Sequence, residues 1–151
     1  MIMRLALFEP DIPQNTGAML RLAACMDVAV DVIEPCGFVW SDRYMRRSGM
    51  DYLERVDLTR YASWEAYREG RQGRLILLTT KGAQSHTSFN FQINDTLLLG
   101  RESVGVPDNV HSYADARIRV PMRKGERALN VALTAAMVLG EALRQTNIFP
   151  D

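Results

Sequence analysis

Two stretches in the last third of the chain decide the fold: Leu97–Pro107 (LLLGRESVGVP) and Ile118–Gln145 (IRVPMRKGERALNVALTAAMVLGEALRQ). The first predicts a buried strand over residues 96–99 that ends at Gly100 and continues into a polar loop containing Glu102. The second predicts a short strand over 118–120 and, after a charged loop, a long helix beginning near Ala128. Because free backbone N–H groups gather at strand-end loops and helix N-termini, these segments predict a cradle for a cofactor.

The rest of the chain alternates between strand and helix patterns. Strands are expected over 4–8, 28–33, 53–58 and 74–79, with a short one near 89–91. Helices are expected from a cap at Asn15 or Thr16 to Met26, from Ser41 to Gly49, from Ser63 to Arg68, and from Asp108 to Tyr113. This order predicts an α/β fold, with a mainly parallel sheet flanked by helices on both faces, in a single domain over residues 1–151.

The two main helices differ in the faces they present. On the first, Met19, Leu22, Ala23 and Met26 share one face while Arg21 points elsewhere. The last carries a stripe rich in small residues, which permits the close approach of another helix within the subunit or across a dimer: Leu129, Ala132, Leu133, Ala136 and Gly140.

Composition excludes several classes of protein. The 151 residues are 47% hydrophobic and 24% charged with zero net charge, which is ordinary for a globular protein and argues against a strongly basic nucleic-acid coat. No apolar run reaches the length of a membrane span and residues 1–10 lack a signal peptide's apolar core, so a cytoplasmic location is expected. Cys25 and Cys36 are not spaced as metal ligands, so buried reduced thiols are expected and no metal.

Arginine makes up 16 of the 18 basic residues. Its planar fork suits phosphate and carboxylate groups, although a GC-rich genome would give the same bias. Familiar catalytic motifs are absent from the sequence: no G-x-G-x-x-G follows the first strand, and neither a P-loop nor a G-x-S-x-G elbow occurs.

Four polar residues remain, expected in loops and helix starts at the carboxyl edge of the sheet: Asn15, Arg21, Glu102 and Asn130. Singly, each has an ordinary role, as a helix cap, a solvated helix residue, a loop carboxylate and a partner for a backbone carbonyl. Together, on separate segments, they form a candidate site. A basic group at 43, 46 and 47 fits either a solvated face or a phosphate contact.

Three motifs in order resemble those of the SPOUT methyltransferases: PDIPQNTG followed by Arg21, LLLGRESVGVP, and RVPM followed by ALNVA. IEPCGF, RRSGMDY and LTTKG extend the resemblance over nearly the whole chain. The chain is most similar to the minimal single-domain branch, the TrmL (YibK-like) tRNA wobble-nucleotide 2′-O-methyltransferases.

The resemblance implies a SPOUT fold with a C-terminal trefoil knot, a homodimer, and S-adenosylmethionine as cofactor. It implies that the cofactor is held largely by backbone groups, at the positions Leu78, Gly100, Val120, Ala128 and Leu129. The family commonly has serine where this chain has Ala128.

The resemblance also assigns roles around the reacting ribose. Arg21 is expected at the 2′-hydroxyl, Glu102 and Asn130 are expected to orient it and the loops, and Asn15 is expected to brace the first motif. Contacts to phosphates of the anticodon stem-loop are expected from Arg43, Arg46, Arg47 and Arg127.

The function expected is 2′-O-methylation of the wobble nucleotide of tRNA, position 34, carrying cytidine or modified uridine. Alternatives are the same chemistry at another tRNA or rRNA site, a non-catalytic RNA-binding module with this fold, and a small-molecule methyltransferase. Arg21, Glu102 and Asn130 together argue against the non-catalytic module.

Overall fold

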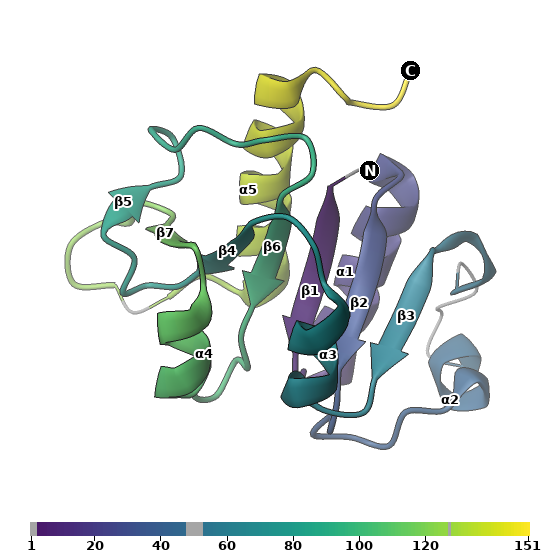
Figure 1. The fold of residues 1–151 in the computed structure, drawn as a ribbon. Coiled ribbons are helices and arrows are strands. Elements are labelled where there is room, and N and C mark those ends of the chain that lie inside the picture. Colours follow the sequence, from purple (N-terminus) through teal and green to yellow (C-terminus); the bar gives the residue numbers. More distant parts are fainter. Residues whose placement is uncertain (1–2, 48–52, 127) are drawn as a thin grey trace.

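Seven parallel strands form one sheet in the order β3-β2-β1-β6-β4-β7-β5 (Figure 1). The computed structural model describes residues 3–47, 53–126 and 128–151. The strands are β1 (Arg4–Phe8), β2 (Ala29–Ile33), β3 (Leu58–Tyr61), β4 (Leu75–Leu78), β5 (Gln84–Ser85), β6 (Thr96–Leu99) and β7 (Ala116–Arg119). The helices are α1 (Pro13–Met26), α2 (Asp42–Arg47), α3 (Trp64–Gly70), α4 (Asp108–Tyr113) and α5 (Val131–Thr146), with a 3₁₀ turn, η1, at Leu53–Arg55.

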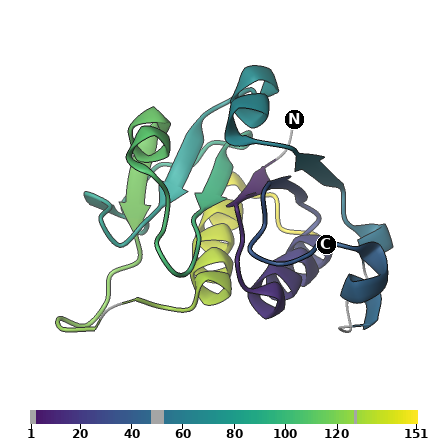
Figure 2. The same ribbon diagram turned by 90° about the horizontal axis from the view of Figure 1, so that it is seen from below.

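Helices cover both faces of the sheet, which confirms the predicted fold class. In β1, Leu5 and Leu7 pack in one core with α1 and α5, whereas Ala6 and Phe8 pack in a second core with α3 and α4. Figure 2 shows the two pairs of helices on opposite sides of the strands. This alternation follows from the two-residue period of a strand, and it explains why the central strands are apolar throughout.

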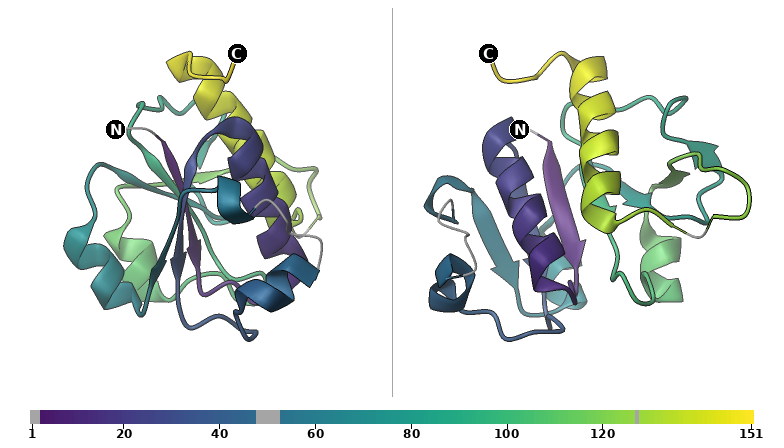
Figure 3. Two further views of the ribbon diagram at one scale, coloured as in Figure 1. Left: turned by 90° about the vertical axis from the view of Figure 1, so that its right-hand side faces the viewer. Right: turned by 180° about the vertical axis from the view of Figure 1, so that it is seen from behind.

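The carboxyl ends of the parallel strands lie at one edge of the sheet, where α1 and α5 both begin (Figure 3). Strands β1 and β6 are neighbours at the centre of the sheet. β1 continues into α1 on one face of the sheet, and β6 continues through a loop to α4 on the other face. A crevice at the carboxyl edge is expected where neighbouring strands connect to opposite faces. The loops after β1 and β6 flank that point.

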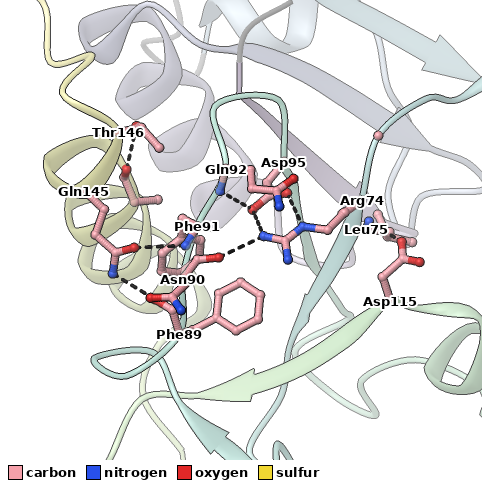
Figure 4. Close-up of polar contacts among 12 residues, drawn as sticks. Arg74, Leu75, Phe89, Asn90, Phe91, Gln92, Asp95, Asp115, Gln145 and Thr146 are labelled. Atoms are coloured by element: carbon pink, nitrogen blue, oxygen red, sulfur yellow. Dashed lines mark hydrogen bonds and ion pairs between the residues drawn. The ribbon is translucent and has the colours of Figure 1, made fainter.

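The long segment between β4 and β6 is fastened at two points (Figure 4). The fully buried carboxylate of Asp95 accepts hydrogen bonds from Arg74 Nε at 2.8 Å and Nη2 at 2.7 Å. The side-chain amide of Gln145 on α5 accepts a bond from Phe91 N at 2.9 Å and donates one to the carbonyl of Phe89 at 2.8 Å. These contacts hold the segment against both the sheet and the last helix.

Two predicted strands are wrong. Residues 53–58 form η1 and a connection, and β3 begins only at Leu58, because Leu53 and Val56 pack on the core from a turn. The alternation around Phe89 and Phe91 imitates a strand, but their backbone groups bond to Gln145, and the short strand β5 lies earlier.

Helix starts and the cysteines also differ from expectation. Pro13, which has no N–H to satisfy, occupies the start of α1, so Asn15 and Thr16 lie inside the helix and neither caps it. The last helix begins at Val131 rather than near Ala128. Cys25 is exposed and Cys36 is half-buried, so the prediction of buried thiols is wrong, and both are free. Burial raises the pKa of Cys36 to about 11.

Other boundaries agree closely with the sequence. Ser63 caps α3, accepting a hydrogen bond from Ala66 N at 3.1 Å, and the predicted span of α4 is confirmed. β7 begins two residues earlier than expected and ends before Val120. Within the described parts of the chain, no helix is both long and apolar enough to cross a bilayer.

Candidate active site

Three side chains from separate motifs form one hydrogen-bonded chain at the carboxyl edge of the sheet. Asn130 Nδ2 donates to Asn15 Oδ1 at 2.9 Å, and Asn15 Nδ2 donates to Glu102 Oε2. Asn130 caps α5, because its Oδ1 accepts from the backbone N–H groups of Ala132 at 2.8 Å and Leu133 at 3.2 Å. The structure thus brings together three of the four residues expected to be catalytic.

The cap fixes the direction of every bond in this chain. Once Asn130 Oδ1 accepts from the helix, its amide nitrogen must donate, so Asn15 must accept with its oxygen and donate with its nitrogen. Glu102 Oε2 therefore accepts a hydrogen bond from Asn15, as a carboxylate oxygen does. Burial raises the pKa of Glu102, and the charge of Asp11 adds to this, while the hydrogen bond from Asn15 opposes it.

A cavity of about 400 Å³ lies beside this network, between the loops that follow β4, β6 and β7 and the start of α5. All five positions expected to bind the cofactor line it, together with two members of the network: Leu78, Gly100, Val120, Ala128, Leu129, Glu102 and Asn130. The structure therefore brings these five positions around one cavity.

The loops around the cavity pack closely against neighbouring backbone at two glycines. Gly100 faces a hairpin closed by reciprocal backbone bonds between Arg101 and Gly105 at 3.1 and 2.9 Å, and a Cβ on Gly100 would lie 2.9 Å from the backbone carbon of Gly105. On the other wall, a Cβ on Gly82 would lie 2.4 Å from the backbone carbon of Ile118. Side chains at these two glycines would push the loops apart, so glycine is required at both.

Sequence reasoning missed several residues around the cavity. Lys81, Arg101, Ser103 and Arg119 also line it. Asp11 lies behind it and accepts hydrogen bonds from the loop that carries Glu102. Their positions in the sequence could have indicated them. Arg119 is the last residue of β7, Lys81 follows β4, and Asp11 lies inside the first motif.

Arg21 does not join the network. It lies six residues after Asn15 on α1, about 240° around the helix at roughly 100° per residue, and its side chain is exposed. Among the residues that the structure describes, the Arg21 side chain has no hydrogen-bond or ion-pair partner. A single chain therefore does not bring Arg21 to Glu102.

The residues expected to contact RNA lie away from the cavity. Arg43 and Arg46 are exposed on α2, beside β3, while the cavity lies at β6, β4 and β7 in the other half of the sheet (Figure 1). Arg46 forms an exposed ion pair with Glu54 at 2.8 Å. The side chain of Arg47, and Arg127 as a whole, lie outside the described residues.

No group of three or more His, Cys, Asp or Glu side chains is placed to hold a metal ion anywhere in residues 3–47, 53–126 and 128–151. The arrangement offers instead a partly open binding site next to a directed hydrogen-bond network and to the cationic side chains of Lys81, Arg101 and Arg119. Such a site suits the binding of a small molecule beside a second substrate that carries an anionic or hydroxyl group.

Comparison with known proteins identifies the family. The sequence pattern of the SpoU rRNA Methylase family matches residues 2–140. A tRNA (cytidine(34)-2′-O)-methyltransferase from Beijerinckia indica is 58% identical over 146 residues, which cover 93% of this chain and 90% of that protein. A solved structure concerned with "the 2-OH methylation of C/U34 on tRNA" superposes with a TM-score of 0.88 at 34% identity, covering 95% of each chain.

A more distant structure shares the fold alone. The SpoU methyltransferase AviRb from Streptomyces viridochromogenes, solved with the cofactor AdoMet, has a TM-score of 0.80 at 24% identity, over 95% of this chain and 60% of that one. The family match over residues 2–140 agrees with the three motifs and with the cavity that their loops enclose. The chain belongs to the SpoU rRNA Methylase family, within the SPOUT methyltransferases.

Proposed function

We propose that this chain transfers a methyl group from S-adenosylmethionine to the ribose 2′-hydroxyl of nucleotide 34 of tRNA, carrying cytidine or a modified uridine. One observation carries the proposal: the cavity expected for the cofactor lies directly beside the network of Asn15, Glu102 and Asn130. The close relative with the same reaction in its name supports the choice of nucleotide.

The cavity fits the proposed cofactor in size and chemistry. Its volume of about 400 Å³ is within the range of small-molecule sites, and its walls combine apolar side chains such as Ile118 and Val120 with strand-end backbone. Leu78, Gly100 and Leu129 would hold the cofactor through main-chain groups. When bound, S-adenosylmethionine supplies a methyl group on a positively charged sulfur.

The protein must position the 2′-oxygen in line with that methyl group and favour loss of the hydroxyl proton to solvent. Glu102, fixed through Asn15 and Asn130, borders the cavity where the ribose would enter. A guanidinium does not act as a base, because it stays protonated in proteins. We therefore assign Arg21 to stabilising the negative charge that develops on the 2′-oxygen.

A homodimer would complete the site. Leu133 and Met137 on α5 are 58% and 48% exposed, forming an apolar surface that a second copy could cover. Arg21 lies on an exposed stripe of α1, and α1 packs beside α5. We propose that Arg21 reaches the cavity of the partner subunit across this surface.

Mixing inactive chains tests that arrangement. Arg21→Ala should keep cofactor binding and lose turnover in single-turnover assays. Refolding Arg21→Ala together with Glu102→Gln should restore activity, because each mixed dimer contains one site with both native residues. Absence of any recovery, with mixed dimers shown to form, would contradict action of Arg21 across the interface.

The RNA is proposed to be held by arginines, with the partner subunit's surface contributing. The ion pair of Arg46 with Glu54 is exposed, so it contributes little stability and leaves the guanidinium available for phosphate. Arg43, Arg47 and Arg127 are assigned the same role. Arg46→Ala should weaken tRNA binding and make its salt dependence shallower, and an unchanged slope of affinity against salt would count against this assignment.

The trefoil knot is a prediction from the family resemblance, and the single domain and the cytoplasmic location are predictions from length and composition. The reaction itself is tested with two synthetic anticodon stem-loops that differ only in ribose or 2′-deoxyribose at position 34. Methyl transfer to the ribose form alone is expected. Equal transfer to both forms, or none to the ribose form, would overturn the proposal.

A further inference from the structure

Asp11 makes more contacts with the loop after β6 than any of the expected catalytic residues does. It lies in the connection between β1 and α1, and its Oδ1 accepts a hydrogen bond from Glu102 N at 3.1 Å. Its Oδ2 accepts from Ser103 Oγ at 2.6 Å and from Ser103 N at 3.4 Å. One carboxylate thus binds two consecutive backbone N–H groups and a hydroxyl.

Asp11 is also confined from the other side. The loop after β2 lies directly against it, since a Cβ on Gly37 would be 2.7 Å from Asp11 Cβ, and Gly37 N donates to the carbonyl of Pro10 at 2.9 Å. Burial acts to raise the pKa of Asp11, but the bonds from Ser103 and from the backbone of Glu102 outweigh it, and the pKa lies below its ordinary value. The residue therefore works as a fixed, ionised acceptor between two loops.

Asp11, in the connection before α1, and Asn15, in the first turn of α1, hold different parts of the same residue. Asp11 binds the backbone of Glu102, and Asn15 binds its carboxylate. Asp11 does not line the cavity, so it reaches the reaction only through Glu102 and Ser103, both of which do. Asp11 therefore holds the loop, whereas Glu102 and Ser103 are the residues that face the cavity.

We infer that Asp11 is a positioning residue for methyl transfer, which docks the 101–105 hairpin against α1 so that the Glu102 carboxylate meets Asn15 at the mouth of the cavity. This inference rests on the proposed function. It differs from a purely structural role because the hairpin closes itself through the bonds between Arg101 and Gly105. Without Asp11 the hairpin would stay folded and shift as a unit.

The test compares Asp11→Ala and Asp11→Asn with Asp27→Asn as a matched control. Asp27 is exposed at the C-terminal cap of α1 with φ of 57°, a conformation that asparagine accepts, so the control removes a carboxylate at the opposite end of α1 from Asp11 without touching the hairpin. The measurements are kcat and KM on a tRNA substrate, S-adenosylmethionine affinity by calorimetry, and amide hydrogen exchange at residues 102 and 103.

Asp11→Ala should lower kcat by about 10- to 100-fold, because a misplacement of the order of 1 Å at a reacting group has that effect. Affinity for S-adenosylmethionine should stay close to wild type, and the two amides should exchange faster. Asp11→Asn should fall between, since its amide keeps one acceptor oxygen. Asp27→Asn should match wild type throughout.

Wild-type kcat in Asp11→Ala would overturn the inference, as would loss of cofactor binding in parallel with activity, which would mean that Asp11 builds the cavity. If the wild-type protein methylates no RNA, the proposed function fails. Exchange at residues 102 and 103 then still decides the docking: unchanged protection in Asp11→Ala refutes it, and faster exchange supports it.

Discussion

Replacing Asn130 by alanine removes two interactions of one side chain. The first is the cap of α5, in which Oδ1 accepts from Ala132 N and Leu133 N. The second is the 2.9 Å bond to Asn15, which fixes the direction of the network that ends at Glu102. Stability depends mainly on the first interaction and catalysis on the second, so the two effects can be separated by the choice of substitution.

The magnitudes follow from these contacts. Loss of an asparagine cap costs about 1 kcal/mol, and loss of the partly solvated bond to Asn15 adds about 0.5–1 kcal/mol. Asn130→Ala should therefore lower the free energy of unfolding by about 1.5–2 kcal/mol, or Tm by about 4–6 °C for a chain of this length. Asn130→Asp keeps an acceptor at the cap and adds a favourable charge at the helix N-terminus, so its stability should stay near wild type.

Activity should behave differently from stability. Asn130→Asp cannot donate to Asn15 and brings a second carboxylate toward Glu102, so its methylation rate should fall about 10- to 100-fold, like that of Asn130→Ala. Ser63→Ala is the matched control, since Ser63 caps α3, which packs on the opposite face of the sheet from α5. It should lose about 1 kcal/mol of stability and keep full activity.

Urea unfolding at one fixed chain concentration measures the stabilities, because dimerisation would make them concentration-dependent. Methyl transfer is measured well below the unfolding transition of every variant. Full activity in Asn130→Asp would refute the assignment of the network to catalysis. Equal loss of activity in Ser63→Ala and Asn130→Ala would show that helix stability alone is responsible.

Three further outcomes follow from other contacts. Burial raises the pKa of Glu102 in the folded state above its ordinary value of 4.5, so the free energy of unfolding of the wild type falls as pH rises from 4.5 through the raised pKa. Glu102→Gln has no carboxyl group to ionise and does not lose this stability. Urea unfolding should therefore find Glu102→Gln more stable than wild type at neutral pH, and the difference in stability should vanish in acid. Arg74→Ala leaves the fully buried Asp95 carboxylate unpaired and should cost about 3 kcal/mol in urea unfolding, against less than about 1 kcal/mol for the exposed Arg144→Ala. Ala128→Ser should leave S-adenosylmethionine affinity unchanged by calorimetry if binding there is through the main chain, and a large tightening would contradict this.

The central strands were predictable because each is a continuous apolar run. Thr96–Leu99 and Leu75–Leu78 are buried on both faces, as expected for parallel strands covered by helices. The prediction of a strand was wrong where a side chain takes the place of a neighbouring strand. The side chain of Gln145 forms hydrogen bonds with the backbone of Phe89 and Phe91, so this strand-like sequence pattern forms no strand. Periodicity reports burial and carries no information about where backbone hydrogen bonds go.

The sequence named the three residues of the hydrogen-bond network and five positions that line the cavity, but it did not predict the contacts between them. The bonds of the network join Asn15 to Glu102, 87 residues away, and to Asn130, 115 residues away. Spacing cannot show such contacts: from its position alone Asn15 looks like a helix cap, and its role in bracing the first motif came from the family resemblance. Asp11 was missed for the same reason, since its partners lie 91 and 92 residues further along the chain.

The central claim is most directly tested by methyl transfer from labelled S-adenosylmethionine to bulk tRNA from a strain lacking this gene, followed by mapping of the labelled nucleotide. Label is expected on the ribose of nucleotide 34 and on no other nucleotide. Label at another nucleotide or on a base would contradict the proposed target, and the absence of label despite cofactor binding would contradict the proposed substrate.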